Sequence, residues 1–239
     1  MLLRIFVFSL ASCCAWAQGK DGPQPRVVDP GGASTAPSDA VALFDGRDLS
    51  HWTTTNGGPA RCTVEAGAMA CKTGSGDIVS KEKFKAAQIH IEFSIPDMPD
   101  QHGQLRGNSG VFLQGRYEVQ VLDSFRNPTY ANGSCAALYG QYAPLVNASP
   151  SPGQWQSYDI VFHPPPCDAS GAVIRKGTLT ILHNGVLAQD HVEIQHATPG
   201  DGGGGVCEAG PIRLQDHSGF PGAPVTVMRF RNIWIRPLD

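Results

Sequence analysis

The chain has 239 residues, 41% of them hydrophobic, and its 18 Lys and Arg against 21 Asp and Glu give a formal net charge of -3. Such a composition is typical of a globular protein that can bury a core, and the length fits one large β domain or two small ones. The basic residues form no long block, so the sequence argues against nucleic acid as a partner.

The first 17 residues, MLLRIFVFSLASCCAWA, have the pattern of an export signal, with a basic residue, a short apolar stretch and then small residues. The apolar stretch is too short to span a membrane. Residues 15–17 (AWA) fit a small-x-small cleavage site and predict a periplasmic or secreted protein. Residues 10–13 (LASC) instead resemble a lipobox, in which Cys13 carries a lipid anchor. Both interpretations place the protein outside the cytoplasm.

The rest of the chain divides into a linker and a β domain. Residues 18–40 are rich in Gly, Pro, Ser and Asp, which predicts a flexible linker. From residue 41 to residue 239, short β-like runs recur between turn residues, and no segment shows a long helical period or a constant repeat. This pattern predicts one all-β domain, an antiparallel sandwich of many short strands.

Removing the signal leaves an odd number of cysteines for an oxidising compartment: Cys62, Cys71, Cys135, Cys167 and Cys207. In CTVEAGAMAC, a two-residue turn at residues 66–67 would set Cys62 opposite Cys71 at a closely spaced position and allow a disulfide. A three-residue turn would put the two sulfurs on opposite faces and prevent it. A second bridge between Cys167 and Cys207 would leave the fifth cysteine free.

Two local signals mark the ends of strands in the second half of the chain. Asn184-Gly185, between two apolar runs in LHNGVL, favours the type I′ turn of a tight hairpin. His183 beside that turn is interpreted as a strand-end residue without a functional role. The run Pro164-Pro165-Pro166 predicts the end of the strand before it, because proline cannot donate to a sheet ladder.

Two predicted strands carry polar stripes. In SGVFLQGRYEVQVLDS (residues 109–124), alternation puts Val119 and Val121 on one face, and the other face carries Gln114, Arg116, Glu118 and Gln120. In GPIRLQDHSG (residues 210–219), the face opposite Ile212 and Leu214 carries Arg213, Gln215 and His217. If the two strands are neighbours in one sheet, the stripes form one polar surface whose directional hydrogen-bonding groups suit a sugar. The competing interpretation is an ordinary solvated outer face.

The chemistry of this surface is limited by its carboxylates. A standard glycosidase needs two carboxylates about 5 to 10 Å apart. On a regular strand, Glu118 and Asp123 would lie about 16 Å apart and point to opposite faces. Asp216 has the opposite parity from His217 and is expected to point inward. One base with several donors suits proton abstraction beside a carbonyl, where the donors hold the developing enolate.

A metal site is the alternative use of these groups. It would combine His217 with Asp216 or Glu118, but the sequence has no HxH, HExxH or CxxC spacing that supports one. We therefore expect neither a metal nor another cofactor.

At these residues the sequence resembles the 3-keto-disaccharide hydrolase domain family. The resemblance runs in order from about residue 41 to the C-terminus through the following motifs: LFDGRDLSHW (residues 43–52), GNSGVFLQGRYEVQVLDS (107–124), ALYGQYAPLVNAS, WQSYDIVFH, HNGV, GPIRLQDH (210–217) and FRNIWIRPL (230–238). The resemblance implies a concanavalin-like jelly roll, in which two antiparallel sheets pack face to face and the ligand lies on the concave side of one.

The resemblance also implies a substrate and a reaction. The substrates of the family are glycosides whose sugar already carries a ketone at C3, which acidifies the hydrogen on C2. A base removes that hydrogen, and the enolate expels the C1 substituent. The net reaction is that of a lyase if it stops there, and that of a hydrolase if water then adds to the unsaturated product. A separate oxidoreductase must make the 3-keto substrate.

The matched motifs supply candidate site residues. The hypothesis is that Glu118 or His217 is the general base, and that Arg116, Arg213 or Gln215 stabilises the enolate oxygen. Other substrate-binding or loop-holding candidates in these motifs are Asn108, Gln120, Asp123, Asp216 and Arg231. For Arg231, structural support is an equal alternative. The chain departs from the family by inserting SGFPGAP (residues 218–224) beside His217, which is expected to reshape the rim of the pocket.

A non-catalytic carbohydrate-binding module of the same fold is the main competing function. Such modules usually present aromatic platforms for sugar stacking. Here 8% of the residues are aromatic and the polar stripe of the Glu118 strand has none, which favours the enzyme. A glycosidase acting on unoxidised sugars is disfavoured by the missing second carboxylate.

Overall fold

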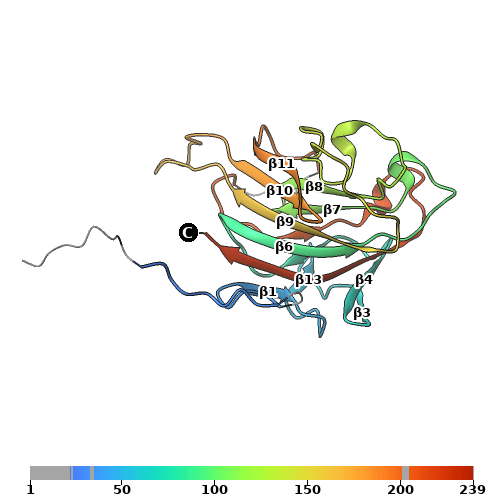
Figure 1. Cartoon of the computed structure of the whole chain (residues 1–239), viewed down its shortest axis with the longest axis horizontal. Coiled ribbons are helices and arrows are strands. Elements are labelled where there is room, and N and C mark those ends of the chain that lie inside the picture. Colours follow the sequence, from blue (N-terminus) through green and yellow to red (C-terminus); the bar gives the residue numbers. More distant parts are fainter. Residues whose placement is uncertain (1–21, 23, 33–34, 201–204, 239) are drawn as a thin grey trace, which may run out of the picture.

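The computed structural model describes residues 22, 24–32, 35–200 and 205–238. In this part of the chain, two antiparallel β-sheets pack face to face, and the helical pieces are three short 3-10 turns, Gly103–Leu105, Ala131–Gly133 and His217–Gly219. In Figure 1, strands of the larger sheet run side by side across the view and β7 and β8 of the smaller sheet lie behind them. The predicted all-β jelly-roll sandwich is confirmed.

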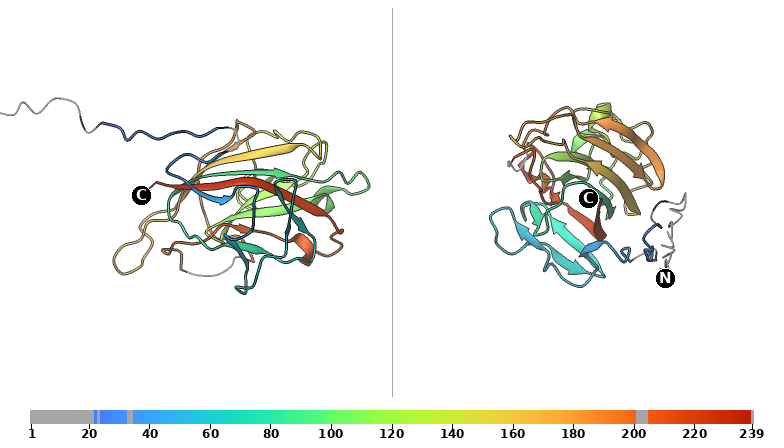
Figure 2. Two further views of the ribbon diagram at one scale, coloured as in Figure 1. Left: turned by 90° about the horizontal axis from the view of Figure 1, so that it is seen from below. Right: turned by 90° about the vertical axis from the view of Figure 1, so that its left-hand side faces the viewer.

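The strands of the two sheets come from distant parts of the sequence. The larger sheet has the order β11 (Val186–Glu193), β10 (Thr178–His183), β9 (Trp155–His163), β6 (Ala87–Ser94), β13 (Val227–Pro237), β4 (Ala68–Lys72) and β3 (Thr63–Glu65), and β1 (Val41–Phe44) pairs with β13. The smaller sheet has the order β2 (Trp52–Thr54), β5 (Ile78–Ser80), β12 (Arg213–Leu214), β7 (Asn108–Leu113) and β8 (Tyr117–Leu122). The C-terminal strand β13 thus lies inside the larger sheet, as its dark red ribbon in Figure 2 shows.

The core lies between the sheets and follows from period-two alternation. In β6, Ile89, Ile91 and Phe93 are buried, while the residues between them are half-buried on the outer face. From the smaller sheet, Val119 and Val121 enter the same core. Each fully buried side chain of this kind contributes about 2 kcal/mol.

The two predicted disulfides are present. Ala66 and Gly67 have φ of 49° and 76°, which is the two-residue turn with left-handed backbone that sets β3 opposite β4. Cys62 and Cys71 are bonded, with their Cα atoms 4.4 Å apart, the separation of a closely spaced antiparallel pair. The second bridge joins residues 167 and 207. Cys135 is a free, buried thiol.

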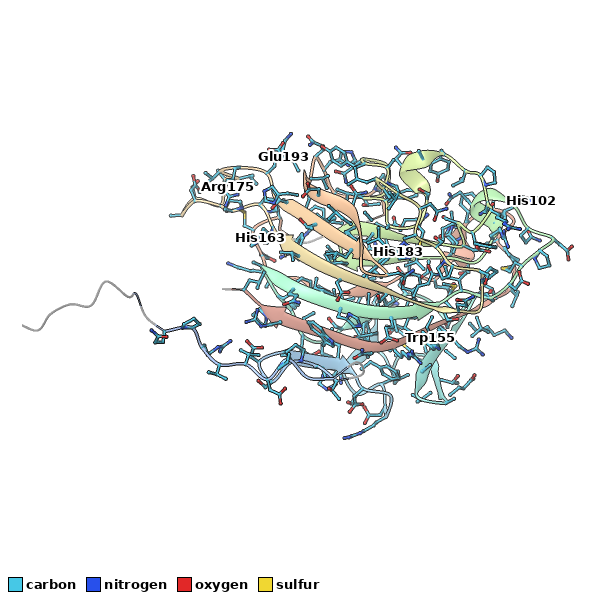
Figure 3. All side chains as sticks on the ribbon, viewed as in Figure 1. His102, Trp155, His163, Arg175, His183 and Glu193 are labelled. Carbon is cyan, nitrogen blue, oxygen red and sulfur yellow. A yellow bond between two sulfur atoms is a disulfide. The ribbon has the colours of Figure 1, made fainter. Side chains whose placement is uncertain are left out.

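The hairpin signals are also confirmed. Asn184 and Gly185 have φ of 52° and 77°, as a type I′ turn requires, and β9 ends at His163, immediately before the three prolines. His183, labelled in Figure 3, is fully buried at the end of β10, and its Nε2 lies 2.8 Å from Gln156 Oε1. Burial lowers the pKa of His183 to about 4, so the ring is a neutral packing residue.

The predicted export signal, residues 1–17, lies outside the described residues. The described part of the predicted linker extends away from the sheets in blue (Figure 2). Its end is held by Asp39, which bonds to Arg26 and accepts a hydrogen bond from Arg236 Nε on β13 at 2.8 Å. Among the described residues, no helix has both the length and the apolar character needed to cross a membrane.

Candidate active site

The polar residues of β8 and β12 lie on the outer face of the smaller sheet. Residues 109–124 do not form one strand, as the alternation predicted, but the hairpin of β7 and β8, and Gln114 and Arg116 lie in its turn, where Gln114 has φ of 53°. Leu214 of β12 and Val119 of β8 belong to the core, whereas Glu118, Gln120 and Arg213 point away from it. The two strands are not direct neighbours, because β7 lies between them. Both stripes therefore share one face, but β7 contributes its own side chains to it.

A cavity of about 360 Å³ opens on this face, and we call it the Glu118 pocket. Strands β7 and β8 supply its floor, and the residues that follow β12, together with other loops, supply its walls. It is lined by Gln104, Asn108, Glu118, Gln120, Tyr139, Pro199, Gln215, Asp216, His217, Gly219, Phe220 and Pro221. Its volume is in the range of small-ligand sites.

Gly110 of β7 makes room for the carboxyl group at the bottom of this pocket. It pairs with Gln120 on one side, and its carbonyl accepts a hydrogen bond from the backbone N–H of Gln215 on the other. A Cβ at Gly110 would lie 2.6 Å from Glu118 Oε1 and 2.9 Å from Phe112 Cε2. The missing side chain is thus what allows the Glu118 carboxyl to fold over the sheet.

Glu118 is a strongly perturbed acid. Its side chain is buried, with 4% of the residue exposed. Burial raises the pKa of Glu118 to about 8, against the opposing charge of Arg213 and with a small further rise from Asp77. Arg213 lies over the ring of Phe112, 3.7 Å from its centroid, with Nη1 3.3 Å from Asp77 Oδ2. At neutral pH the Glu118 carboxyl is therefore mostly protonated.

His217 is held at the rim of the pocket by a short capped turn. It begins the 3-10 turn His217–Gly219, and Asp216 accepts the backbone N–H of Ser218 at 3.1 Å. The ring stacks on Phe220 with a centroid distance of 5.0 Å. Burial lowers the pKa of His217, and the charge of Asp216 opposes this. The imidazole is therefore mostly neutral at pH 7 and available as a base.

Three amide side chains present acceptors in the pocket. Asn108 Oδ1, Gln120 Oε1 and Gln215 Oε1 are buried and have no hydrogen-bond partner among the described residues. The amide nitrogens of Asn108 and Gln120 each donate to Gln104 Oε1 at 3.1 Å. A buried acceptor left unpaired costs about 1 to 3 kcal/mol, which a ligand hydroxyl can offset by donating to it.

Residues 39–236 match the sequence model of the 3-keto-alpha-glucoside-1,2-lyase-like domain. The chain belongs to this family. A crystal structure of a candidate glycosyl hydrolase from Parabacteroides distasonis ATCC 8503, at 2.13 Å resolution, is 45% identical with a TM-score of 0.82, and the alignment covers 91% of this chain and 94% of that one. No protein with curated functional information matches significantly.

More distant structures share the fold of the 3-keto-alpha-glucoside-1,2-lyase-like family. A second candidate glycosyl hydrolase from the same organism, at 1.70 Å resolution, is 19% identical with a TM-score of 0.62, over 84% of this chain and 94% of that one. Alginate lyase Aly36B is 9% identical with a TM-score of 0.50, over 84% of this chain and 98% of that one. At these identities the likeness concerns the fold alone.

Four predicted site residues, Arg116, Asp123, Arg213 and Arg231, do not line the Glu118 pocket, and two of them, Asp123 and Arg231, have structural partners elsewhere. Asp123 Oδ2 is 2.7 Å from Arg106 Nη2, so its carboxylate holds a loop. Arg231 lies on β13 of the other sheet, with Nε 2.6 Å from Glu92 Oε2 and its guanidinium over the ring of Trp155. Arg231 was included because it stands in a motif shared with the family, and such a motif does not show which sheet its strand joins. We leave both out of the candidate site.

Two further residues, Asp216 and Arg116, lie elsewhere than the alternation predicted. Asp216 lines the pocket, as its neighbour His217 does, instead of pointing inward. Its Oδ2 accepts the backbone N–H groups of Gly74 and Gly76 at 2.8 and 2.7 Å, so this carboxylate anchors a turn. Arg116 lines a separate cavity on the same sheet.

Several pocket residues were missed by the sequence reasoning. Tyr139 stands in the ALYGQY motif, and its hydroxyl lies 2.6 Å from that of Tyr130. Phe220 belongs to the insertion that the sequence marked as a departure, and it is 44% exposed at the rim. Gln104 and Pro199 come from loops that carry no sequence signal. In the part of the chain that the structure describes, no three His, Cys, Asp or Glu side chains are grouped as metal ligands would be.

Proposed function

We propose that the protein is an exported carbohydrate-active enzyme that cleaves glycosides bearing a ketone at C3, by removing the C2 proton and eliminating the C1 substituent. The observation that carries the proposal is the pairing of Glu118 and His217 in one pocket. The pKa of the carboxyl is raised to about 8 and that of the imidazole is lowered. A carboxyl group with a raised pKa and an imidazole with a lowered pKa can act as acid and base at neutral pH.

The protonation states favour His217 as the base and Glu118 as the acid. With a pKa of about 8, roughly nine in ten Glu118 carboxyls hold a proton at pH 7. With a pKa below its usual 6.5, most His217 rings are neutral at that pH. The reverse assignment, with Glu118 as the base, would use the minor form of the carboxyl.

The proposed reaction then runs in two steps. His217 takes the proton from C2, and the electrons of the C2–H bond form an enolate with its charge on the C3 oxygen. The enolate collapses to the ketone, a double bond forms between C1 and C2, and the C1–O bond breaks as Glu118 protonates the leaving oxygen. Water adding across that double bond would turn the lyase product into the hydrolase product.

The remaining polar groups fit the roles of holding the sugar and its enolate. Gln215 and the Tyr139 hydroxyl line the pocket and can donate to the C3 oxygen as charge develops. The unpaired amide oxygens of Asn108 and Gln120 can accept from sugar hydroxyls. Arg213 lines the neighbouring cavity, and its positive charge favours the ionised form of Glu118 after proton transfer.

The same geometry argues against a standard glycosidase. The pocket is lined by two carboxyl groups, Glu118 and Asp216. Backbone N–H groups already bind both oxygens of Asp216. A second carboxylate available for activating water or attacking C1 is therefore missing from the lining, whereas elimination from a 3-keto sugar needs no such pair.

The test is to incubate the purified protein with a 3-keto-glucoside and with its parent glucoside, and to follow release of the C1 substituent. We expect cleavage of the 3-keto-glucoside and not of its parent. We also expect kcat to fall by about 10²-fold or more in His217→Ala and in Glu118→Gln. His163→Ala, at the remote end of β9, is the matched control and should keep full activity. Cleavage of the parent alone would overturn the mechanism, and binding without cleavage of either would indicate a binding module.

A further inference from the structure

A second cavity, of about 310 Å³, opens on the same sheet, and we call it the Arg116 cavity. Its charged lining is predominantly positive, with Lys83, Arg116 and Arg213 against the single carboxylate of Glu208. Lys83 and Glu208 are exposed, whereas the two arginines are buried. The fixed positive charge of the cavity therefore comes from its buried wall.

Arg116 is a buried cation without an anionic partner among the described residues. Only 3% of the residue is exposed. Its Nη1 donates to Gln114 Oε1 at 3.3 Å, a neutral acceptor, and its Nε is buried with no hydrogen-bond partner in the described part of the chain. The buried Arg213 differs, because it is paired with Asp77. A buried charge normally requires a counter-charge, so the position of Arg116 points to an anion supplied from outside.

The cavity is close enough to the Glu118 pocket for one substrate to reach both. Arg116 precedes Glu118 by two residues, so their Cα atoms are separated by about 7 Å in extended backbone. Arg213 lies in the wall of the Arg116 cavity and is also the main opposing charge on Glu118. An anion at Arg116 would therefore lie in the cavity next to the pocket that holds the reacting carboxyl.

We propose that the Arg116 cavity is a subsite for an oxyanion, a carboxylate or a sulfate, on the group attached to the sugar that is cleaved at Glu118. The planar guanidinium binds either oxyanion through paired N–H donors. The proposal rests on the proposed function for the position of the sugar. It adds a substrate class, namely glycosides whose leaving group is negatively charged.

The test compares two phenyl glucosides that differ in one group, 4-carboxyphenyl and the uncharged, nearly isosteric 4-carbamoylphenyl. Each is used unoxidised for calorimetric binding and as the 3-keto form for turnover. We expect the wild-type protein to bind the carboxylate about 10- to 100-fold more tightly, the range of a charge-assisted hydrogen bond, and Arg116→Gln to reduce this ratio to near 1. Arg47→Gln, which removes an exposed arginine on another loop, should keep the ratio.

Equal binding of the two glucosides by the wild-type protein, or a preference that survives Arg116→Gln, would overturn the subsite. Should Arg116→Gln fail to fold, competition on the wild-type protein replaces it. Free benzoate should then displace the carboxyphenyl glucoside, with chloride at matched ionic strength as the control, and no displacement would overturn the subsite. If the protein cleaves both 3-keto forms without preference, the subsite is overturned and the proposed function stands. If it binds the carboxylate preferentially but cleaves neither 3-keto form, the proposed function is overturned and the subsite stands.

Discussion

Replacing Glu118 by Gln should stabilise the fold while abolishing the chemistry. In the unfolded chain this carboxyl ionises with a pKa near 4.5, whereas in the folded protein burial raises the pKa to about 8. Above pH 4.5 the folded state must therefore hold a proton that the unfolded chain releases, so stability falls as pH rises through this window. This effect lowers the free energy of unfolding by about 1 kcal/mol at pH 5, about 3 kcal/mol at pH 7 and about 5 kcal/mol at pH 9. An amide of the same shape has no such cost.

The assay is reversible urea unfolding of both proteins at pH 5, 7 and 9. The free energy of unfolding of Glu118→Gln should exceed that of the wild type by an amount that grows with pH and reaches about 3 kcal/mol at pH 7. Glu193→Gln on β11 is the control, because that side chain is 61% exposed and its replacement should change stability by less than about 0.5 kcal/mol. A stability difference for Glu118→Gln that stays constant from pH 5 to pH 9 would refute the burial argument.

Two further predictions concern the pocket floor and the disulfides. Gly110→Ala should lower kcat by about 10-fold or more, because the added Cβ would lie 2.6 Å from Glu118 Oε1 and must displace that carboxyl. Steady-state kinetics measures the loss. An unchanged kcat would contradict the packing at the floor of the pocket. Removing the disulfide between Cys62 and Cys71, which spans 9 residues, should lower the free energy of unfolding by about 3 kcal/mol, and removing the one between Cys167 and Cys207, which spans 40, should lower it by about 4 kcal/mol. Chemical denaturation of the two Cys→Ser double variants measures both values. The opposite order would show that loop length does not govern the two contributions.

Local chemistry allowed much of this fold to be predicted. Alternation in YEVQVLDS placed Val119 in the core and Glu118 outside it, because a strand with one buried face fixes the parity of every side chain. Likewise, the Ala66-Gly67 turn fixed the register that brings Cys62 to Cys71. These features depend only on neighbours within a few residues, which a single sequence displays.

What could not be predicted depends on contacts between distant segments. Nothing in the sequence shows that Gly110 lies beneath Glu118 or that Phe112 lies beneath Arg213, since both relations arise from the order of strands in the sheet. For the same reason, the family motif that supplied Arg231 could not show that its strand, β13, belongs to the other sheet. Loop residues such as Gln104 enter the pocket through chain paths that have no periodic pattern.

The most direct test of the central claim is the pH dependence of kcat/KM for a 3-keto-glucoside. With His217 as the base and Glu118 as the acid, activity should form a bell that falls on the acid side with a pKa below 6.5 and on the alkaline side near pH 8, as the carboxyl loses its proton. His217→Ala should remove the acid limb from the residual activity. Activity that instead rises through pH 8 to a plateau would contradict this assignment and identify Glu118 as the base.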